Sequence, residues 1–133
     1  MLKAIADTHA IIWYIFGDIR LSLTARSFIN ATELEGNQIG ISTASLAEIV
    51  YLVEKGRVPT NTFSQLYDLV ERPNSLLVEQ VFNRQVARAM FEVERLKVPD
   101  FPDRMITATA LYLNVPLISR DTKIQASGIN IIW

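Results

Sequence analysis

The chain has no cysteine and only one histidine among its 133 residues. The absence of cysteine excludes disulfide bonds, thiolate zinc sites and a cysteine nucleophile. The single histidine, His9, excludes any mechanism that needs a pair of histidines. A metal ion bound by this protein would therefore take mainly oxygen ligands, which suit hard divalent cations.

Long hydrophobic runs and a strong charge of either sign are also missing. The longest apolar run, Ala10–Phe16, is too short to cross a bilayer, and no signal-type segment opens the chain. The net charge of −1 argues against a protein that coats nucleic acid by bulk electrostatics. We therefore expect a cytoplasmic protein without a membrane partner. A nuclease is not excluded, because the acids of a metal site lower the net charge.

Half of the residues are hydrophobic and a fifth are charged, which is typical of an ordered chain. From its length we expect one domain, residues 1–133. Short apolar runs and helical periodicity predict strands at 2–6, 38–42, 75–78, 115–119 and 129–132, and helices at 9–16, 22–34, 43–55, 60–71, 83–96 and 103–114. This alternation predicts an α/β fold, a three-layer α/β/α sandwich with a largely parallel central sheet.

Four carboxylates lie after predicted strands, at a helix start or within an apolar helix. Asp7 directly follows the first predicted strand, and Asp121 closely follows a later one. Glu48 interrupts an otherwise apolar helix, and Asp103 opens another helix. In an α/β fold these places can converge on one edge of the sheet, where acids repel one another unless a cation joins them. The four acids therefore predict a divalent-cation site.

Each acid also has a purely structural interpretation. Asp7 and Asp103 could cap the helices that follow them, and Asp121 could be a turn residue. Glu48 could form a capping box with Ser45, but the helix would then have to begin later than its sequence favours. Taken singly, only Glu48 favours function over structure. The joint placement of the four acids is what indicates a common site.

Four short motifs, in this order, resemble those of the PIN-domain ribonucleases, and most closely the VapC-type toxins of toxin–antitoxin pairs. The motifs are Asp7-Thr-His9, Ser45-Leu-Ala-Glu-Ile49, Pro102-Asp-Arg-Met-Ile-Thr-Ala-Thr-Ala110 and Ser119-Arg-Asp121. The resemblance covers the whole chain in order and in length. It implies a PIN-like fold and a Mg²⁺- or Mn²⁺-dependent endoribonuclease. Such an ion lowers the pKa of a bound water and stabilises charge on the phosphate.

The resemblance also implies the site residues and the partners. It places the metal-binding catalytic acids at Asp7, Glu48, Asp103 and Asp121, with supporting roles for Thr8 and Ser119. One motif departs from the family: many members have Asp-Pro-Phe-Asp-Arg, whereas this chain has Asp100-Phe-Pro-Asp103-Arg104, which leaves the role of Asp100 open. The implied partners are an RNA substrate, a second copy in a homodimer and a small antitoxin that inserts a segment toward the acids.

Several other residues near the motifs have two interpretations each. Arg104, Arg120 and Lys123 could hold RNA phosphates or could pair with the neighbouring acids. His9 is expected to pack or hydrogen-bond beside Asp7, with a phosphate contact as the alternative. Trp13 could stack on a base, although packing in the core is favoured.

Other functions fit part of the pattern. A PIN-like nuclease could act in RNA processing, and a flap-endonuclease-like enzyme could act on DNA. A haloacid-dehalogenase-type phosphatase is disfavoured, because His9 stands where its Asp-x-Asp motif needs the second acid. A non-enzymatic α/β interaction module would use the acids only as caps, and divalent ions would then neither raise its melting temperature nor support cleavage.

Overall fold

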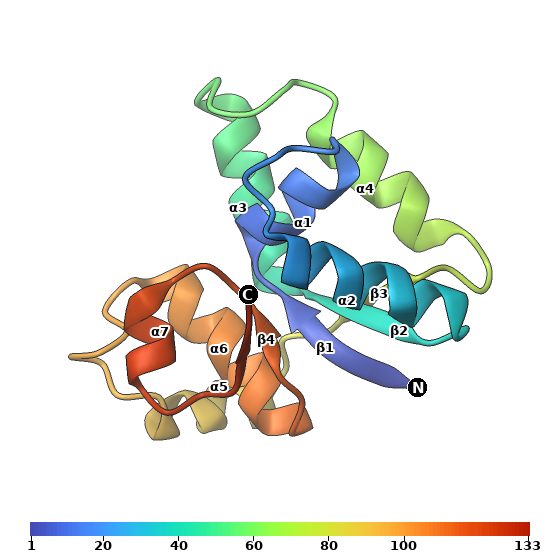
Figure 1. Cartoon of the computed structure of the whole chain (residues 1–133). Coiled ribbons are helices and arrows are strands. Elements are labelled where there is room, and N and C mark those ends of the chain that lie inside the picture. Colours follow the sequence, from blue (N-terminus) through green and yellow to red (C-terminus); the bar gives the residue numbers. More distant parts are fainter.

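The computed structural model describes residues 1–133 and has a five-stranded parallel sheet at its centre (Figure 1). The strands lie in the order β3-β2-β1-β4-β5, and their bounds are β1 Leu2–Ala6, β2 Gln38–Ser42, β3 Leu77–Gln80, β4 Leu117–Ile118 and β5 Ile131–Ile132. The helices are α1 Thr8–Ile15, α2 Leu23–Leu34, α3 Thr43–Glu54, α4 Thr62–Glu71, α5 Arg84–Ala89, the 3₁₀ turn η1 Met90–Glu92, α6 Phe101–Leu113 and α7 Thr122–Ala126. The predicted α/β/α fold is confirmed.

Helices cover both faces of the sheet, with α1–α4 on one face and α5–α7 on the other (Figure 1). The alternation of side chains along β1 explains this division, because successive residues point to opposite faces. Ala4 and Ala6 belong to the core under α1–α4, whereas Ile5 belongs to the core under α5–α7. The strand is therefore apolar at every one of these positions, as parallel strands buried on both faces usually are.

One glycine is required by close packing within the sheet. Gly40 lies in the middle of β2, where it pairs with Ile5 of β1 and Val78 of β3. A Cβ atom at this position would lie 2.6 Å from Ile5 Cδ1 and 2.9 Å from Gln80 Cγ. The missing side chain therefore leaves space for the neighbouring strands' side chains on the face toward α5–α7.

The prediction of one helix over 83–96 was wrong. Helix α5 ends at Ala89, the 3₁₀ turn η1 follows, and Val93 has extended backbone angles (φ −94°, ψ 112°). A tertiary contact accompanies this break: Arg104 Nη2 donates to the carbonyl oxygens of Met90, at 2.8 Å, and Val93, at 3.3 Å. Arg104 thus supplies a donor to carbonyl oxygens that lack the amide partner four residues on that a continuing helix would provide.

The boundaries of the last elements also differ from those predicted. Helix α6 begins at Phe101 rather than Asp103, because Pro102 fits the first turn of a helix, where its missing N–H is not needed. Helix α7 was not predicted at all, and strand β3 lies two residues later than expected. The predicted strands at 115–119 and 129–132 keep only two paired residues each.

None of the helices combines the length and apolar character needed to cross a membrane.

Candidate active site

The order of the strands creates a crevice at the carboxyl edge of the sheet. From β1 the chain proceeds outward to β2 and β3, and then crosses to β4 and β5 on the other side. Open parallel sheets bind their ligands where the strand order reverses in this way. A cleft of about 380 Å³ lies here, and it is lined by Asp7, Thr8, His9, Trp13, Glu48, Asp100, Asp103, Arg120 and Asp121. The structure therefore brings all four predicted acids together.

Two of the acids also cap helices. Asp7 follows β1 and accepts a hydrogen bond from the Ala10 amide at 2.8 Å, which fixes the start of α1. Asp121 follows β4 and accepts from the Lys123 amide at 2.8 Å, at the start of α7. The turn predicted at Asp121 is thus a helix N-terminus. Both side chains line the cleft as well, so the structural and the functional interpretations are compatible.

Glu48 is held in the cleft by hydroxyl groups that lie beneath it. The Thr8 hydroxyl donates to Glu48 Oε1 at 2.5 Å, and Thr8 Oγ1 lies 3.1 Å from Ser45 Oγ. Both Thr8 and Ser45 are buried. Ser42 caps α3 by accepting from the Ala44 amide at 3.1 Å, so the capping box of Ser45 and Glu48 does not form. The hydroxyls therefore orient the carboxylate.

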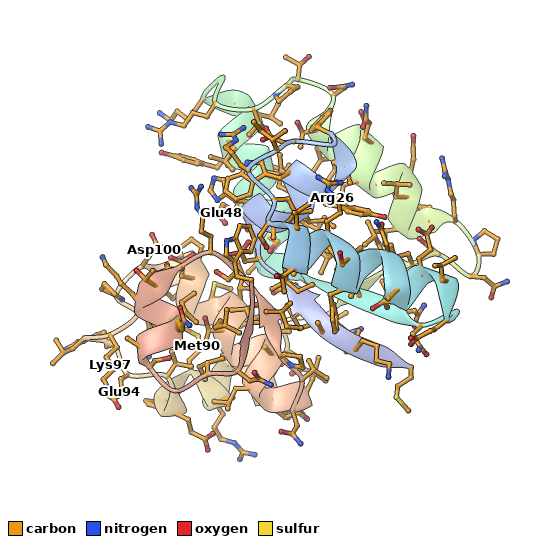
Figure 2. The ribbon with its side chains drawn as sticks, viewed as in Figure 1. Arg26, Glu48, Met90, Glu94, Lys97 and Asp100 are labelled. Carbon is orange, nitrogen blue, oxygen red and sulfur yellow. The ribbon has the colours of Figure 1, made fainter.

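The start of α6 shows the role of Asp100, which the departure from the family motif had left open. Asp100 is the N-cap of this helix, and its carboxylate accepts from the Asp103 amide at 3.0 Å. Asp100, and not Asp103, therefore caps this helix, so the purely structural interpretation of Asp103 does not apply. Asp103 lies in the first turn, where its carboxylate extends into the cleft. Figure 2 shows Asp100 and Glu48 on the same side of the molecule.

The acids affect one another's protonation. Burial, together with the smaller effects of the negative charges of Asp100, Asp121, Glu48 and Asp7, raises the pKa of Asp103 to about 7. Burial also raises the pKa of Asp7, while hydrogen bonds from the Ser119 hydroxyl and the Ala10 amide oppose this shift. The cleft therefore favours a bound positive charge, because a cation would relieve both the repulsion and the desolvation.

The donor chemistry of the cleft fits a hard divalent cation. Asp7, Glu48, Asp103 and Asp121 supply only oxygen atoms and negative charge, which are the ligands that such ions prefer. No three acidic or histidine side chains converge closely enough to form a complete ligand set in this arrangement. Side-chain rotations would be needed to complete one, and Thr8 already restricts the rotation of Glu48.

The three predicted basic residues have different surroundings. Arg104 donates to main-chain carbonyls and does not line the cleft, so neither of its predicted roles agrees with its position. Lys123 is exposed on α7 and does not line the cleft either. Arg120 does line the cleft, with its guanidinium carbon 4.6 Å from the centre of the Trp13 ring. Ser119 is buried and accepts from the Asp121 amide at 3.0 Å.

Ser45 and Trp13 were not among the site residues predicted from the sequence. Ser45 lies three residues before Glu48, on the same side of α3, and this spacing could have indicated it. Trp13 was expected in the core, where it is 4% exposed. The centre of its ring lies 6.0 Å from that of Trp133 and 5.7 Å from that of His9. Its position beside Arg120 depends on folding and has no sequence signal.

A larger apolar groove adjoins the cleft. It has a volume of about 980 Å³ and shares His9, Trp13, Glu48 and Asp100 with the cleft. Its other walls come from α1, α3, the loop after α3 and the start of α6, and include Ile12, Phe16, Ala47, Tyr51, Phe101 and Met105. A mostly apolar groove of this volume has the dimensions that ligand pockets have in proteins.

Comparison with known families identifies the class of protein. The model of the PIN domain matches residues 4–128, so the chain belongs to the PIN-domain family. PIN domains are nucleases, and the acid cleft lies where the fold places a ligand site. No match is found among curated proteins.

Solved structures with this fold include components of toxin–antitoxin complexes. The chain is similar to VapBC2 from Rickettsia felis, bound to a fragment of its promoter DNA, with 21% identity, a TM-score of 0.69 and coverage of 98% of this chain and 97% of that chain. A toxin–antitoxin complex from Klebsiella pneumoniae matches with the same identity, TM-score and coverage. FitAcB from Neisseria gonorrhoeae matches with 18% identity, a TM-score of 0.62 and coverage of 98% and 96%.

Proposed function

We propose that this PIN domain is a Mg²⁺- or Mn²⁺-dependent endoribonuclease and the toxin of a VapBC-type pair. One observation carries the catalytic part of the proposal. Five acids, the four predicted ones and Asp100, line one cleft at the carboxyl edge of the sheet, and the charges of the other four add to the effect of burial on the pKa of Asp103. Bringing several carboxylates together lowers the stability of the fold, and a bound divalent ion would offset that loss.

The chain's own residues would prepare the site for hydrolysis of a phosphodiester bond. Asp7, Glu48, Asp103 and Asp121 would hold the ion, which supplies a water of lowered pKa and neutralises charge on the phosphate. The caps formed by Asp7 and Asp121 fix these two carboxylates to the starts of helices. Thr8 fixes the third by its hydrogen bond to Glu48.

The apolar groove supports the antitoxin part of the proposal. It is continuous with the cleft through four shared residues, so one segment could cover apolar side chains and reach the acids. A helix or extended peptide with apolar residues, followed by an Arg or Lys, has the chemistry to match both regions. The antitoxin would thereby occupy the place of the metal ion and the substrate.

The remaining partners follow from the family resemblance. We propose that the chain acts in the cytoplasm, as one half of a homodimer. Light scattering coupled to gel filtration checks the dimer: a mass near twice 15.0 kDa is expected, and a mass near 15.0 kDa at every concentration would contradict it.

The proposed reaction is tested with matched substrates. Single-stranded RNA and DNA of the same sequence are incubated with the purified chain and Mg²⁺, Mn²⁺ or EDTA. We expect cleavage of RNA only, dependent on the ion, with 5′-phosphate and 3′-hydroxyl ends. Cleavage of DNA in preference to RNA would identify a DNase instead. Failure of either ion to raise the melting temperature or support cleavage would favour a non-enzymatic module.

A further inference from the structure

Arg120 is a cation in an acidic cleft that pairs with none of the acids. It follows β4, is exposed, and lines the cleft together with Asp7, Asp103 and Asp121. The ion pairs of the structure are Arg20–Asp18 and Lys97–Glu94. The cleft acids therefore do not determine where the guanidinium of Arg120 lies.

The guanidinium of Arg120 lies instead against an indole ring, that of Trp13. The guanidinium carbon of Arg120 lies 4.6 Å from the centre of the Trp13 ring, within the range of a cation–π interaction. Trp13 is itself buried, and the rings of Trp133 and His9 pack against it at tilted angles of 58° and 48°. The ring is thus a rigid platform that belongs to α1, next to Asp7.

Two other arginines near the site have protein partners for their N–H groups, which Arg120 lacks. Arg20 also lies over the Trp13 ring, at 5.1 Å, but its Nη2 donates to Asp18 at 2.7 Å. Arg104 donates to two main-chain carbonyls. The arginine side chains that donate hydrogen bonds within the protein are those of Arg20, Arg26 and Arg104. Arg120 therefore retains all its donors for a ligand.

We propose that Arg120 binds a backbone phosphate of the RNA at the edge of the acid cleft, and that Trp13 is its positioning residue. A planar guanidinium matches the geometry of a phosphate, and stacking on an indole leaves its N–H edge available. Such a contact would offset the repulsion between the cleft carboxylates and any phosphate that the metal ion does not bind. This inference rests on the proposed ribonuclease function.

The test compares steady-state cleavage of single-stranded RNA by the wild type and by Arg120→Ala, Arg120→Lys and Trp13→Phe. For Arg120→Ala we expect KM to rise about tenfold with kcat little changed, and the slope of log affinity against log salt to fall by about 0.7, as for one lost phosphate contact. Arg120→Lys should keep the salt slope while KM rises, because lysine retains the positive charge but lacks the paired N–H donors of a guanidinium. Trp13→Phe should likewise raise KM and keep the slope.

The control is Arg88→Ala, which removes one positive charge from the exposed side of α5, outside the cleft. It should leave both KM and the salt slope unchanged. If Arg120→Ala kept the wild-type KM and salt slope, the inference would be overturned and the ribonuclease proposal would stand. The same holds if Arg120→Ala lost affinity for the antitoxin alone. A wild-type chain that cleaves no RNA would overturn the proposed function itself. Because Arg120 is exposed, its variants should fold, and they test the phosphate contact even if Trp13→Phe does not fold.

Discussion

The acid cleft and the apolar groove are neighbours with opposite chemistry. The cleft is small and is lined almost entirely by polar and charged side chains, whereas the groove is more than twice as large and mostly apolar. They share His9, Trp13, Glu48 and Asp100, so a molecule in one lies against the other. Polar clusters suit a metal ion and a phosphate, while apolar grooves suit a protein segment.

Under the proposed function, this difference separates the catalytic region from the region that would bind an inhibitor. A catalytic cleft has to remain open to a charged substrate, and therefore has little apolar area with which to bind an inhibitor tightly. The groove supplies that area at the same edge of the sheet, on α1, α3 and the start of α6. Separating catalysis from inhibitor affinity in this way is testable by mutations confined to one region.

The largest effect should come from removing one acid of the cleft. Asp103→Asn should abolish metal-dependent RNA cleavage, by more than about a hundredfold, because it deletes a negative ligand at the reacting centre. The fold should remain intact, as circular dichroism would check. Asp100→Asn is the matched control three residues earlier, and it should keep most activity, since asparagine caps a helix nearly as well. Equal losses in the two variants would contradict the separate roles of these acids.

The next largest effect should be confined to the groove. Ala47 lies on α3, is exposed, and lines the groove without lining the cleft. Ala47→Gln should weaken binding of the cognate antitoxin by about tenfold or more, because it places a polar side chain in an apolar contact. Calorimetry measures this affinity, and RNA cleavage without antitoxin is the control. Loss of cleavage with unchanged antitoxin affinity would show that the two regions are not separate.

A smaller effect is expected beneath Glu48. Thr8→Val keeps the shape of the side chain and removes the hydroxyl that donates to this carboxylate. We expect activity or metal affinity to fall about tenfold, as for other residues that orient metal ligands. Ser45→Ala, one step farther from the carboxylate, should cost less. If Thr8→Val matched the wild type in metal titrations, the orienting role of the hydroxyl would be wrong.

The smallest effect is a dependence of stability on pH. Because the pKa of Asp103 rises from 3.8 to about 7 on folding, the folded protein keeps a proton that the unfolded chain releases. Stability without metal should therefore fall as pH rises from about 4 to 7, and stabilisation by Mg²⁺ should grow over the same interval. Melting temperatures should show a shift of several degrees. Asp103→Asn should reduce this dependence without abolishing it, because the pKa of Asp7 is also raised by burial, and an unchanged profile would rule out Asp103 as a source.

Much of the fold was predictable because it depends on local pattern. The strands at 2–6 and 38–42 and the cap at Ser22 agree with the structure, since apolar runs and capping side chains act within a few residues. The end of helix α5 at Ala89 did not follow from the local pattern, and the Met90 carbonyl beyond it bonds to the side chain of Arg104, 14 residues away in sequence. Helix α7 was missed because five residues are too few for a periodic signal.

The sequence by itself determined the α/β architecture and the identity of the four acids, because both depend on residue type and order along the chain. Tertiary structure alone decided which neighbours each acid has. Asp100 caps α6 and leaves Asp103 in the cleft, while Thr8 reaches Glu48 across 40 residues of sequence. It also separated Arg104, which binds carbonyls, from Arg120, which lies over Trp13. The physical reason is that a side chain's partner depends on distances in space, which local periodicity does not encode.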